Sequence, residues 1–325
     1  MSRVSATRAR SALAWVLVAP WAAWAVVRAG GLDRGFPLVQ LVAYTPYAVA
    51  LAALAAIAAL LLRRRAAAAV AAVAAVVLAA LVAPRAVGGG EAAAAAEPRL
   101  RVVTANVYNG EVAPGELVAL VRRERADVLA LQELTPALAA ELDRRLRPVL
   151  PHARVAAWPG AAGTALYSRV PMRELPAPPG LRVAMTHAEL RVPGAAPVRV
   201  MSVHPTAPLR RSATSRWRGD LRSLPAAPAR GPVQILAGDF NATLDHRELR
   251  RLLGQGYRDA ADVTGAGLRP TWRGRRAPPV TIDHVLAPER VAVLGVAVRE
   301  LPGSDHRAVT ATLALPQMGT RPDPR

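Results

Sequence analysis

Residues 233–241 read VQILAGDFN, a short apolar run that ends in glycine, aspartate, phenylalanine and asparagine. Apolar runs of this kind, bounded by turn-forming residues, predict a buried β-strand. Asp239 and Asn241 stand at the end of that strand, where side chains point into a crevice while the apolar body stays buried. The stretch therefore predicts a strand in a buried sheet, with side chains capable of chemistry at its end.

Short apolar runs of the same kind recur over residues 100–316. Short β-type runs alternate with helical or Pro- and Gly-rich segments, an order that predicts one layered domain of α+β structure. Strands are expected at residues 100–105, 128–131, 164–168, 198–203, 233–237, 282–287 and 308–313, and helices at residues 115–125 and 136–147.

Further polar residues occur at the ends of these predicted strands. A carboxylate directly after a buried strand is costly unless it is solvated, paired or bound to a cation, so Glu133 is a candidate metal ligand. Taken singly, each residue also fits a turn or a helix cap, and Glu133 also fits a charge at the start of a helix. The set comprises Asn106, Glu133, His204, Asp239, Asn241, Asp283, Asp305 and His306.

In chain order, the motifs that contain these residues are N, QE, SxH, GDFN, IDH and SDH. This series resembles the endonuclease/exonuclease/phosphatase superfamily, and GDFN and SDH are its most specific elements. The resemblance implies a DNase I-like four-layer αββα sandwich, in which two packed β-sheets are flanked by helices. It also implies a metal-dependent hydrolase of phosphodiester or phosphomonoester bonds.

The resemblance further implies a Mg²⁺ cofactor, with Mn²⁺ as a substitute. Glu133 resembles the principal ligand of that ion, and Asn106 and Asp305 resemble further members of the metal site. Oxygen ligands suit Mg²⁺, and the absence of cysteine excludes thiolate sites and disulfides.

The remaining motif residues resemble the catalytic groups of the superfamily. Asp239 matches the carboxylate that orients or deprotonates the attacking water, and Asn241 matches a residue that holds a phosphate oxygen. His306 matches the histidine that contacts the scissile phosphate, while Asp283 resembles the carboxylate that holds its imidazole in one tautomer.

Two positions concern particular members of the superfamily. His204 resembles a histidine on the leaving-group side, but the GTALYSR segment contains no acidic partner for it. Tyr108 stands where abasic-site endonucleases carry an additional acidic metal ligand. The missing partner weighs against a leaving-group role for His204, and Tyr108 weighs against the abasic-site subfamily. Thr271 and Trp272 resemble a packing element of the superfamily and are not expected to take part in catalysis.

Three apolar stretches open the sequence, at about residues 11–27, 36–62 and 66–83. A membrane-spanning helix needs about 20 residues, with about 17 as the lower limit, so all three are long enough. They predict about three transmembrane helices within residues 1–83 and a multi-pass protein of the cell membrane, with the lipid bilayer as a partner. A cleaved signal is the alternative for the first stretch, and a buried soluble helix for the Ala- and Val-rich third.

The third stretch also decides the side of the membrane. With three spans, the N-terminal arginines and Arg63, Arg64 and Arg65 lie on the cytoplasmic side, which makes the domain after residue 84 extracytoplasmic. With two spans, that domain lies inside. Residues 84–99 have the Gly- and Ala-rich composition of a linker, and residues 317–325 are expected to form a disordered tail.

All 42 basic residues are arginines, and the net charge is +19. Because this composition also fits a GC-rich coding bias, the charge is weak support for a nucleic-acid substrate. The cluster Arg210, Arg211, Arg216 and Arg218 slightly favours nucleic acid, unless it forms a solvated face. The anchor favours a phospholipid headgroup, as in a sphingomyelinase-like phosphodiesterase. An inactive membrane-binding protein is the third alternative, and no obligate protein partner is expected.

Overall fold

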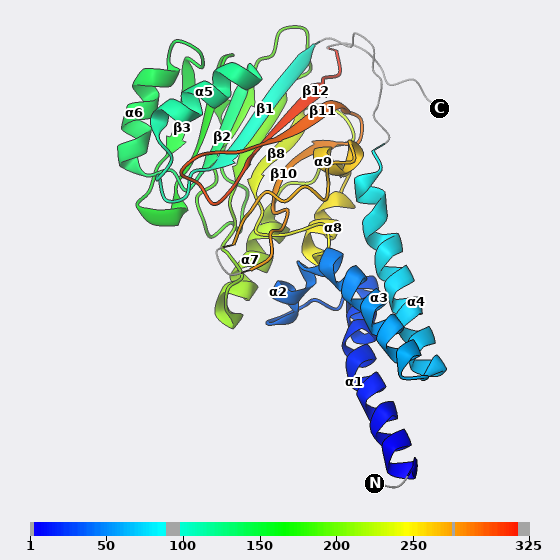
Figure 1. The fold of residues 1–325 in the computed structure, drawn as a ribbon. Helices are drawn as coiled ribbons and strands as arrows, with labels where there is room; N and C mark the ends of the chain where they lie inside the picture. The colour runs from blue at the N-terminus through cyan, green and yellow to red at the C-terminus, as the bar shows by residue number, and fades with distance from the viewer. Residues whose placement is uncertain (1–2, 89–97, 275–276, 318–325) are drawn as a thin grey trace. The chain divides into compact units, whose positions relative to one another are not determined.

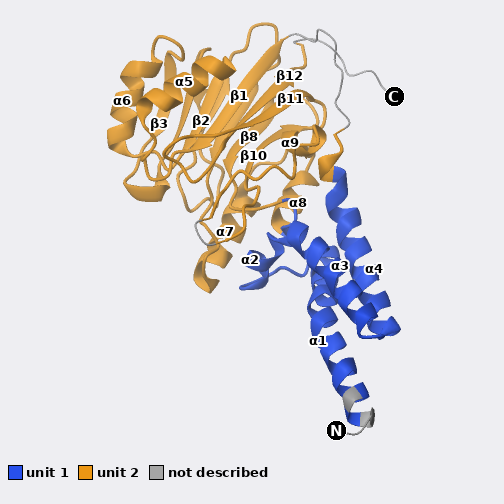
Figure 2. Cartoon of the chain, in the orientation of Figure 1, with its two compact units in different colours: residues 1–84, 244–247 blue, residues 85–243, 248–325 orange. Residues whose placement is uncertain are grey.

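The computed structural model of the chain describes residues 3–88, 98–274 and 277–317, which form two compact units (Figure 2). The first, called the helical unit, comprises Met1–Pro84 with Leu244–Arg247. The second, called the sandwich unit, comprises Arg85–Thr243 and Glu248–Arg325. The expected linker and C-terminal tail lie largely outside the described residues, so both stay predictions.

Alanine-rich helices build the helical unit (Figure 1). Its last two helices run antiparallel, because they are joined by a tight turn in which the Arg64 N–H donates to the Ala59 carbonyl at 2.8 Å. Buried alanines recur every three or four residues, such as Ala48, Ala52 and Ala55, so their small side chains form one packed stripe. The helices are α1 (Arg3–Gly30), α2 (Leu38–Val42), α3 (Thr45–Leu61) and α4 (Arg65–Val82).

Two helices of the described chain are long and apolar enough to cross a membrane, Thr7–Gly30 and Arg65–Ala86. The predicted stretch 36–62 does not form one helix. It is divided into α2 and the 17-residue α3. Pro37 precedes α2 and Pro46 lies in the first turn of α3, positions where proline begins a helix rather than continuing one. The expectation of three long apolar helices is therefore wrong, and two meet the requirement.

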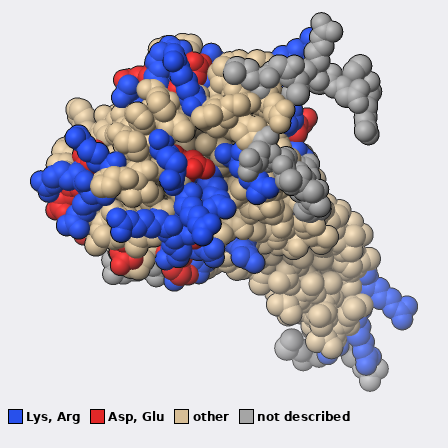
Figure 3. Space-filling view, turned by 90° about the horizontal axis from the view of Figure 1, so that it is seen from above, with Lys and Arg blue, Asp and Glu red and all other residues tan. Residues whose placement is uncertain are grey.

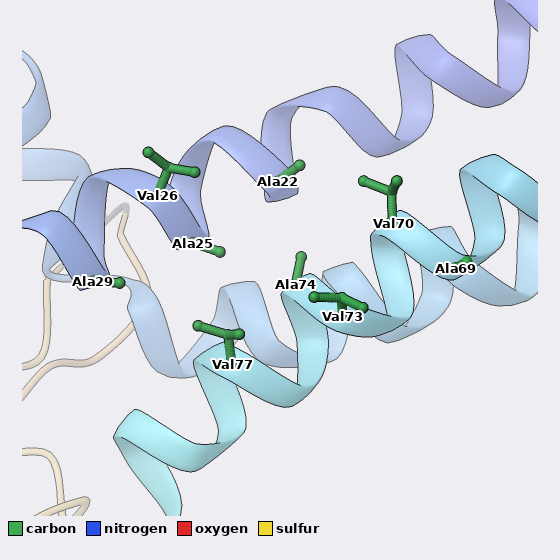
Figure 4. A pocket seen from close by; sticks show the side chains of 9 residues that line it. All are labelled: Ala22, Ala25, Val26, Ala29, Ala69, Val70, Val73, Ala74 and Val77. Carbon is green, nitrogen blue, oxygen red and sulfur yellow. The ribbon is translucent and has the colours of Figure 1, made fainter.

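Helices α1 and α4 border an apolar hollow of about 440 Å³ (Figure 4). Its lining side chains are all alanine or valine, so they offer a ligand neither hydrogen bonds nor charge. They are Ala22, Ala25, Val26, Ala29, Ala69, Val70, Val73, Ala74 and Val77.

Two six-stranded sheets form the centre of the sandwich unit. In each sheet one pair of central strands is parallel, β1 with β2 and β7 with β8, and the other pairs are antiparallel. Sheet A has the order β11 (Ala292–Arg299), β12 (Ala308–Ala314), β1 (Arg99–Asn106), β2 (Val128–Gln132), β4 (Thr164–Ser168), β3 (His152–Ala156). Sheet B has the order β5 (Met172–Glu174), β6 (His187–Leu190), β7 (Val198–Val203), β8 (Val233–Asp239), β10 (Asp283–Pro288), β9 (Tyr257–Asp259).

The two sheets pack face to face through alternate residues of their strands. Val102 and Val128 of sheet A share one fully buried cluster with Val200 and Ile235 of sheet B. This cluster between the sheets consists of apolar side chains, so it supplies the main hydrophobic stabilisation of the unit.

Helices cover the outer faces, which confirms the expected layering of helix, sheet, sheet and helix. Leu117 and Leu142 of the two helices on sheet A share a buried cluster with Val103 and Leu129 of its strands. These helices are α5 (Pro114–Glu124) and α6 (Pro136–Leu146). The remaining elements are α7 (Arg211–Ser223), α8 (Arg247–Leu253), α9 (Ala260–Val263) and the 3-10 turns η1 (Ala83–Ala86) and η2 (Gly160–Ala162).

The parallel pairs decide where the chemistry lies. Because their strands run in one direction, the carboxyl ends of β1 and β2 lie at one edge of sheet A, and those of β7 and β8 at one edge of sheet B. Buried Gln132 Nε2 donates to Ser202 Oγ at 2.9 Å, and that hydroxyl donates to the Leu131 carbonyl at 2.8 Å. These bonds join sheet A to sheet B near the ends of the four strands.

Every strand and helix that the sequence predicted in this unit is present within two residues of its expected bounds. The pattern missed the helices α7, α8 and α9 and the strands β3, β5, β6, β9 and β11. Four of these five strands are edge strands. An edge strand is less buried and therefore lacks the continuous apolar run by which the central strands were recognised.

Candidate active site

The side-chain amide of Asn106 links the two sheets where the strand ends meet. Asn106 is the last residue of β1 and is fully buried. Its Nδ2 donates to Glu133 Oε1 at 2.9 Å and to Asp239 Oδ2 at 3.1 Å. Its Oδ1 accepts the Tyr108 N–H at 2.9 Å, which fixes the orientation of the amide. Two predicted carboxylates, one from each sheet, thus converge on one donor.

Glu133 directly follows β2 in a left-handed conformation, with φ 59°. Residues with a side chain rarely adopt this conformation, and those that do concentrate at functional sites. Glu133 Oε2 accepts the N–H of Asn109 at 2.8 Å, and Asn109 is itself left-handed, with φ 53°. The Glu133 side chain is 13 % exposed, so it is held by the protein yet reachable from outside.

The local geometry of the GDFN turn explains its residue types. A Cβ at Gly238 would collide with the Val203 carbonyl of the neighbouring strand β7, so a glycine is required there. Asp239 Oδ1 accepts the Asn241 N–H at 2.8 Å, and Asn241 is left-handed, with φ 49°. Asn241 Nδ2 donates to the Pro205 carbonyl at 3.1 Å, which ties the end of β8 to the segment after β7.

His306 and Asp283 form a buried pair, with Nδ1 and Oδ2 2.9 Å apart. Asp283 begins β10 and lies opposite Asp239 of β8 in the antiparallel register. Thr271 Oγ1 accepts the Asp283 N–H at 3.0 Å, and Ser304 Oγ accepts the His306 N–H at 3.0 Å. His306 Nε2 lies 3.7 Å from Asp239 Oδ2. The imidazole is therefore flanked by two carboxylates.

The charges of this group follow from burial and pairing. Burial lowers the pKa of His306, but the negative charges of Asp283 and Asp239 and the hydrogen bond to Asp283 outweigh that effect and raise the pKa to about 10. Burial raises the pKa of Asp239 above its ordinary value, against the opposing charge of His306. The His306 imidazole is therefore protonated at neutral pH, which makes its Nε2 a cationic hydrogen-bond donor.

The two other predicted residues border the same cluster. His204 Nε2 lies 3.8 Å from Glu133 Oε1 and 3.7 Å from Asp239 Oδ2. Asp305 Oδ1 lies 3.9 Å from His306 Nε2. The structure thus brings all eight predicted site residues together at one end of the sandwich unit.

Two supporting residues were not recognised as such from the sequence. Trp272, predicted as a packing residue, also donates from Nε1 to Asp305 Oδ2 at 3.0 Å. Buried His284 has Nδ1 2.8 Å from Asp259 Oδ2 and Nε2 2.8 Å from the Ala242 carbonyl. Both partners accept hydrogen bonds, so His284 holds the segment after the GDFN turn. Its place next to Asp283 in the IDH motif was the available signal, but only the strand pairing shows its partners.

The cluster fits a divalent cation. Glu133, Asp239, Asp283 and Asp305 gather around the single His306 imidazolium, so the cluster holds more carboxylates than that one cation offsets. Asp283 Oδ1 and Asp305 Oδ1 are buried and have no hydrogen-bond partner within the described ranges. Asp239, Asp283 and His306 each have an atom that could bind a metal ion, and these three atoms lie within 4.8 Å of one another. The hydrogen bond between His306 and Asp283 already accounts for part of that closeness. Oxygen-rich donor sets of this kind suit a hard divalent ion.

Converging carboxylates, amide donors and a buried imidazolium at the end of a two-sheet sandwich can neutralise a phosphate and prepare a water molecule for attack. This combination defines an enzyme that hydrolyses phosphoesters. The chain belongs to the Endonuclease/Exonuclease/phosphatase family, whose sequence profile matches residues 103–306. The predicted family and enzyme class are confirmed.

Solved structures share the fold at low sequence identity. An endonuclease/exonuclease/phosphatase from Beutenbergia cavernae DSM 12333 is 21% identical, with a TM-score of 0.52, and the match covers 68% of this chain and 72% of that one. TDP2 of D. rerio, complexed with a single-strand DNA product, is 19% identical, with a TM-score of 0.52 and coverage of 67% and 99%. The 3'-5' exonuclease NExo from Neisseria meningitidis is 20% identical, with a TM-score of 0.51 and coverage of 65% and 98%. No curated protein matches the sequence.

The buried pair generates a prediction about protonation. In Asp283→Asn, the nearest negative charge and the charged hydrogen bond are removed while burial still lowers the pKa, so the pKa of His306 should fall clearly below about 10 even though Asp239 and Asp305 keep their charges. Histidine-labelled protein in EDTA, titrated by NMR, gives this value directly. The control Asp143→Asn changes an exposed α6 carboxylate and should leave the His306 titration where it was. An unchanged His306 titration in Asp283→Asn would contradict the assigned cause.

Proposed function

We propose that the chain is a membrane-anchored, Mg²⁺-dependent phosphoesterase that hydrolyses phosphodiester or phosphomonoester bonds by attack of water. The observation that carries this proposal is the surroundings of Asp239. Its Oδ2 lies 3.7 Å from Nε2 of both His204 and His306 and accepts the Asn106 amide at 3.1 Å. The carboxylate of Asp239 is thus surrounded by hydrogen-bond donors, which can also bind the oxygens of a phosphate and orient an attacking water molecule.

Each side chain takes one part in the proposed reaction. Asp239 orients the attacking water and accepts its proton, since a raised pKa makes this carboxylate a stronger base than an ordinary aspartate. The His306 imidazolium donates from Nε2 to an oxygen of the scissile phosphate, while Asp283 holds the ring through Nδ1. Asn241 contacts a phosphate oxygen, and His204 faces the leaving group.

The metal would be held by the residues that the sequence singled out, Glu133, Asn106 and Asp305. When bound, Mg²⁺, or Mn²⁺ in its place, supplies a Lewis acid that offsets the charge of the phosphate oxygens. The closeness of Glu133 to Asp239 and the unpartnered Oδ1 of Asp305 support carboxylate ligands, and Asn106 would offer its Oδ1, since its NH₂ group donates to the two carboxylates.

A generic ester such as bis-nitrophenyl phosphate tests the reaction. We expect turnover with Mg²⁺ or Mn²⁺ and none after addition of EDTA. Asp239→Ala and His306→Ala should each lower kcat by at least about a hundredfold, because general-base and electrostatic contributions are of that size. The controls Asp143→Ala in α6 and His152→Ala in β3 should retain kcat. Wild-type turnover in a folded Asp239→Ala or His306→Ala protein would overturn the assignment.

We propose nucleic acid as the substrate. Two exposed aromatic side chains belong to segments that hold the site. Tyr108 is 38 % exposed, and its backbone N–H donates to the Asn106 side chain. Trp158 is 64 % exposed, and its backbone N–H donates to the carbonyl of Leu134, the residue after Glu133. Exposed aromatic rings stack on bases without regard to sequence. TDP2, which shares the fold, is known with a single-strand DNA product, and this likeness favours the same chemical class of substrate.

The arginines after β7 support this substrate less than the sequence suggested. Arg222 Nη2 forms an ion pair with Glu248 Oε1 at 2.7 Å. The Nε atoms of Arg218 and Arg251 lie 3.7 and 3.3 Å from oxygens of the same carboxylate. Arg218 is therefore engaged inside the unit, whereas Arg210 and Arg211 are exposed. In the view of Figure 3, arginine side chains gather on the sandwich unit and outnumber the acidic ones.

A substrate panel separates nucleic acid from phospholipid. The full chain should hydrolyse DNA or RNA, and KM for the polynucleotide should rise with salt because phosphate contacts release counterions. Sphingomyelin vesicles and inositol phosphates should be poor substrates under the same conditions. Faster turnover of sphingomyelin than of any polynucleotide would favour the phospholipid alternative. A metal-binding chain with no turnover on the whole panel would instead support the inactive membrane-binding protein.

We propose that the helical unit is the membrane anchor. Thr7–Gly30 and Arg65–Ala86 are long and apolar enough to cross a bilayer, and Val16 and Val76 are each more than 60 % exposed. Since α3 is joined to α4 by a tight turn and packs beside it, a bilayer that surrounds α4 also surrounds α3. The 17-residue α3, at the lower length limit for a span, is then a third and shorter crossing, which makes the sandwich unit extracytoplasmic in a multi-pass protein of the cell membrane.

Extraction and labelling test the anchor. The full chain should stay in the membrane pellet after washing with alkaline carbonate and should be released by detergent. Protease added outside intact cells should cleave the sandwich unit. Release by carbonate would contradict the anchor, and protection of the sandwich unit in intact cells would contradict its proposed side.

A further inference from the structure

A second group of basic and hydroxyl side chains lies on sheet A, away from the catalytic cluster. Arg101 pairs with Thr312 and Val103 with Thr310 across β1 and β12, and residues paired in this way share one face of a sheet. Val103 packs with the helices of the outer layer, so this is the outer face. Arg101 precedes Asn106 by about 16 Å of extended strand.

A groove of about 350 Å³ lies on this face, beside the C-terminal end of α5 and over β12 and β11. Gly295 and Ala297 of β11 line it, opposite Thr312 and Thr310. A Cβ built at Gly295 would meet no atom within 4 Å. The groove is open because two small residues stand where larger side chains would fill it.

Three guanidinium groups and one carboxylate surround the groove. Arg299 Nε donates to Glu124 Oε1 at 2.8 Å, and Arg123 Nε donates to the same oxygen at 3.4 Å. Arg101 donates to the Glu124 backbone carbonyl at 3.5 Å. The carboxylate offsets one positive charge, so the lining keeps an excess of positive charge. The terminal nitrogens of Arg123 and Arg299 have no further hydrogen bond within the described ranges and can donate to a ligand.

Thr310 gives a second, independent indication of a ligand. Its side chain is 5% exposed, and its hydroxyl has no hydrogen-bond partner in the described part of the chain. A buried hydroxyl without a partner is unfavourable, and such groups mark places where water or a ligand completes the hydrogen bonding. Thr310 lines the groove together with the three arginines.

We propose that this groove binds the phosphate group of a small anionic ligand at a site separate from the catalytic cluster. The guanidinium groups donate to its oxygens from the rim, and the Thr310 hydroxyl donates from the floor. A tetrahedral phosphate offers enough acceptor oxygens for several guanidinium donors and a hydroxyl at once, and guanidinium is the side chain best matched to it. Glu124 holds Arg123 and Arg299 in place and leaves their outer nitrogens for the ligand.

Titration of the full chain with inorganic phosphate in the presence of EDTA tests the site. The wild type should bind phosphate, and Gly295→Glu, which places a carboxylate in the groove at a position where a Cβ meets no atom within 4 Å, should weaken the affinity by at least about tenfold. Gly115→Glu is the matched control, since a Cβ there also meets no atom within 4 Å and the residue lies at the other end of α5. It should bind phosphate as the wild type does.

Thr310→Val separates a ligand-binding hydroxyl from a merely unpartnered one. If the hydroxyl binds phosphate, the variant loses affinity. If it does not, the variant gains thermal stability and keeps its affinity. Equal phosphate binding in the wild type and Gly295→Glu, or no binding in the wild type, overturns the proposal. Vesicles that contain phosphatidate identify the source of the phosphate: displacement of inorganic phosphate by them indicates a lipid headgroup, and no displacement indicates a free anion.

Discussion

The buried amide of Asn106 couples the fold to the site. Its single NH₂ group donates to a carboxylate beside sheet A and to a carboxylate of sheet B. In a buried environment both bonds are strong, and loss of either would leave a polar group without a partner. The amide can form both only when β1 and β8 face each other in the observed register. The two hydrogen bonds of the Asn106 amide therefore require both that the sheets pack in this way and that the site residues lie together.

Other buried polar groups reinforce the same register. Gln132 and Ser202 join the sheets a short distance below the amide, and Gly238 lets the backbone of β8 approach β7 closely. In the QE, SxH and GDFN motifs, a structural residue thus stands one or two positions before each predicted site residue. Motif and fold are specified together, which is why short motifs in this sequence were informative about both.

Central strands and motif residues could be predicted because they leave local patterns. A buried strand is a run of apolar residues, and a site residue follows it directly, as Asp239 follows VQILAG. Contacts between distant segments leave no such pattern. The hydrogen bond of Trp272 to Asp305, the engagement of Arg218 by Glu248 and the pairing of His284 with Asp259 each join residues that are far apart in sequence. Residues 36–62 contain two prolines that indicate separate helices. The sequence nevertheless predicted one long helix, because the whole stretch is continuously apolar.

Strand order in sheet A also has a consequence for the synthesis of the protein. The first strand of the sandwich unit, β1, pairs with its last strand, β12, and His306 lies two residues before β12. The ribosome synthesises β1, which ends in Asn106, long before it synthesises β12. The side of β1 that pairs with β12 therefore has no partner while most of the domain is translated. His306 is therefore synthesised after every other residue of the cluster. The nascent chain has no complete site until β12 closes the sheet, and a partly synthesised domain holds the carboxylates and amides of the site without the imidazole that lies between them.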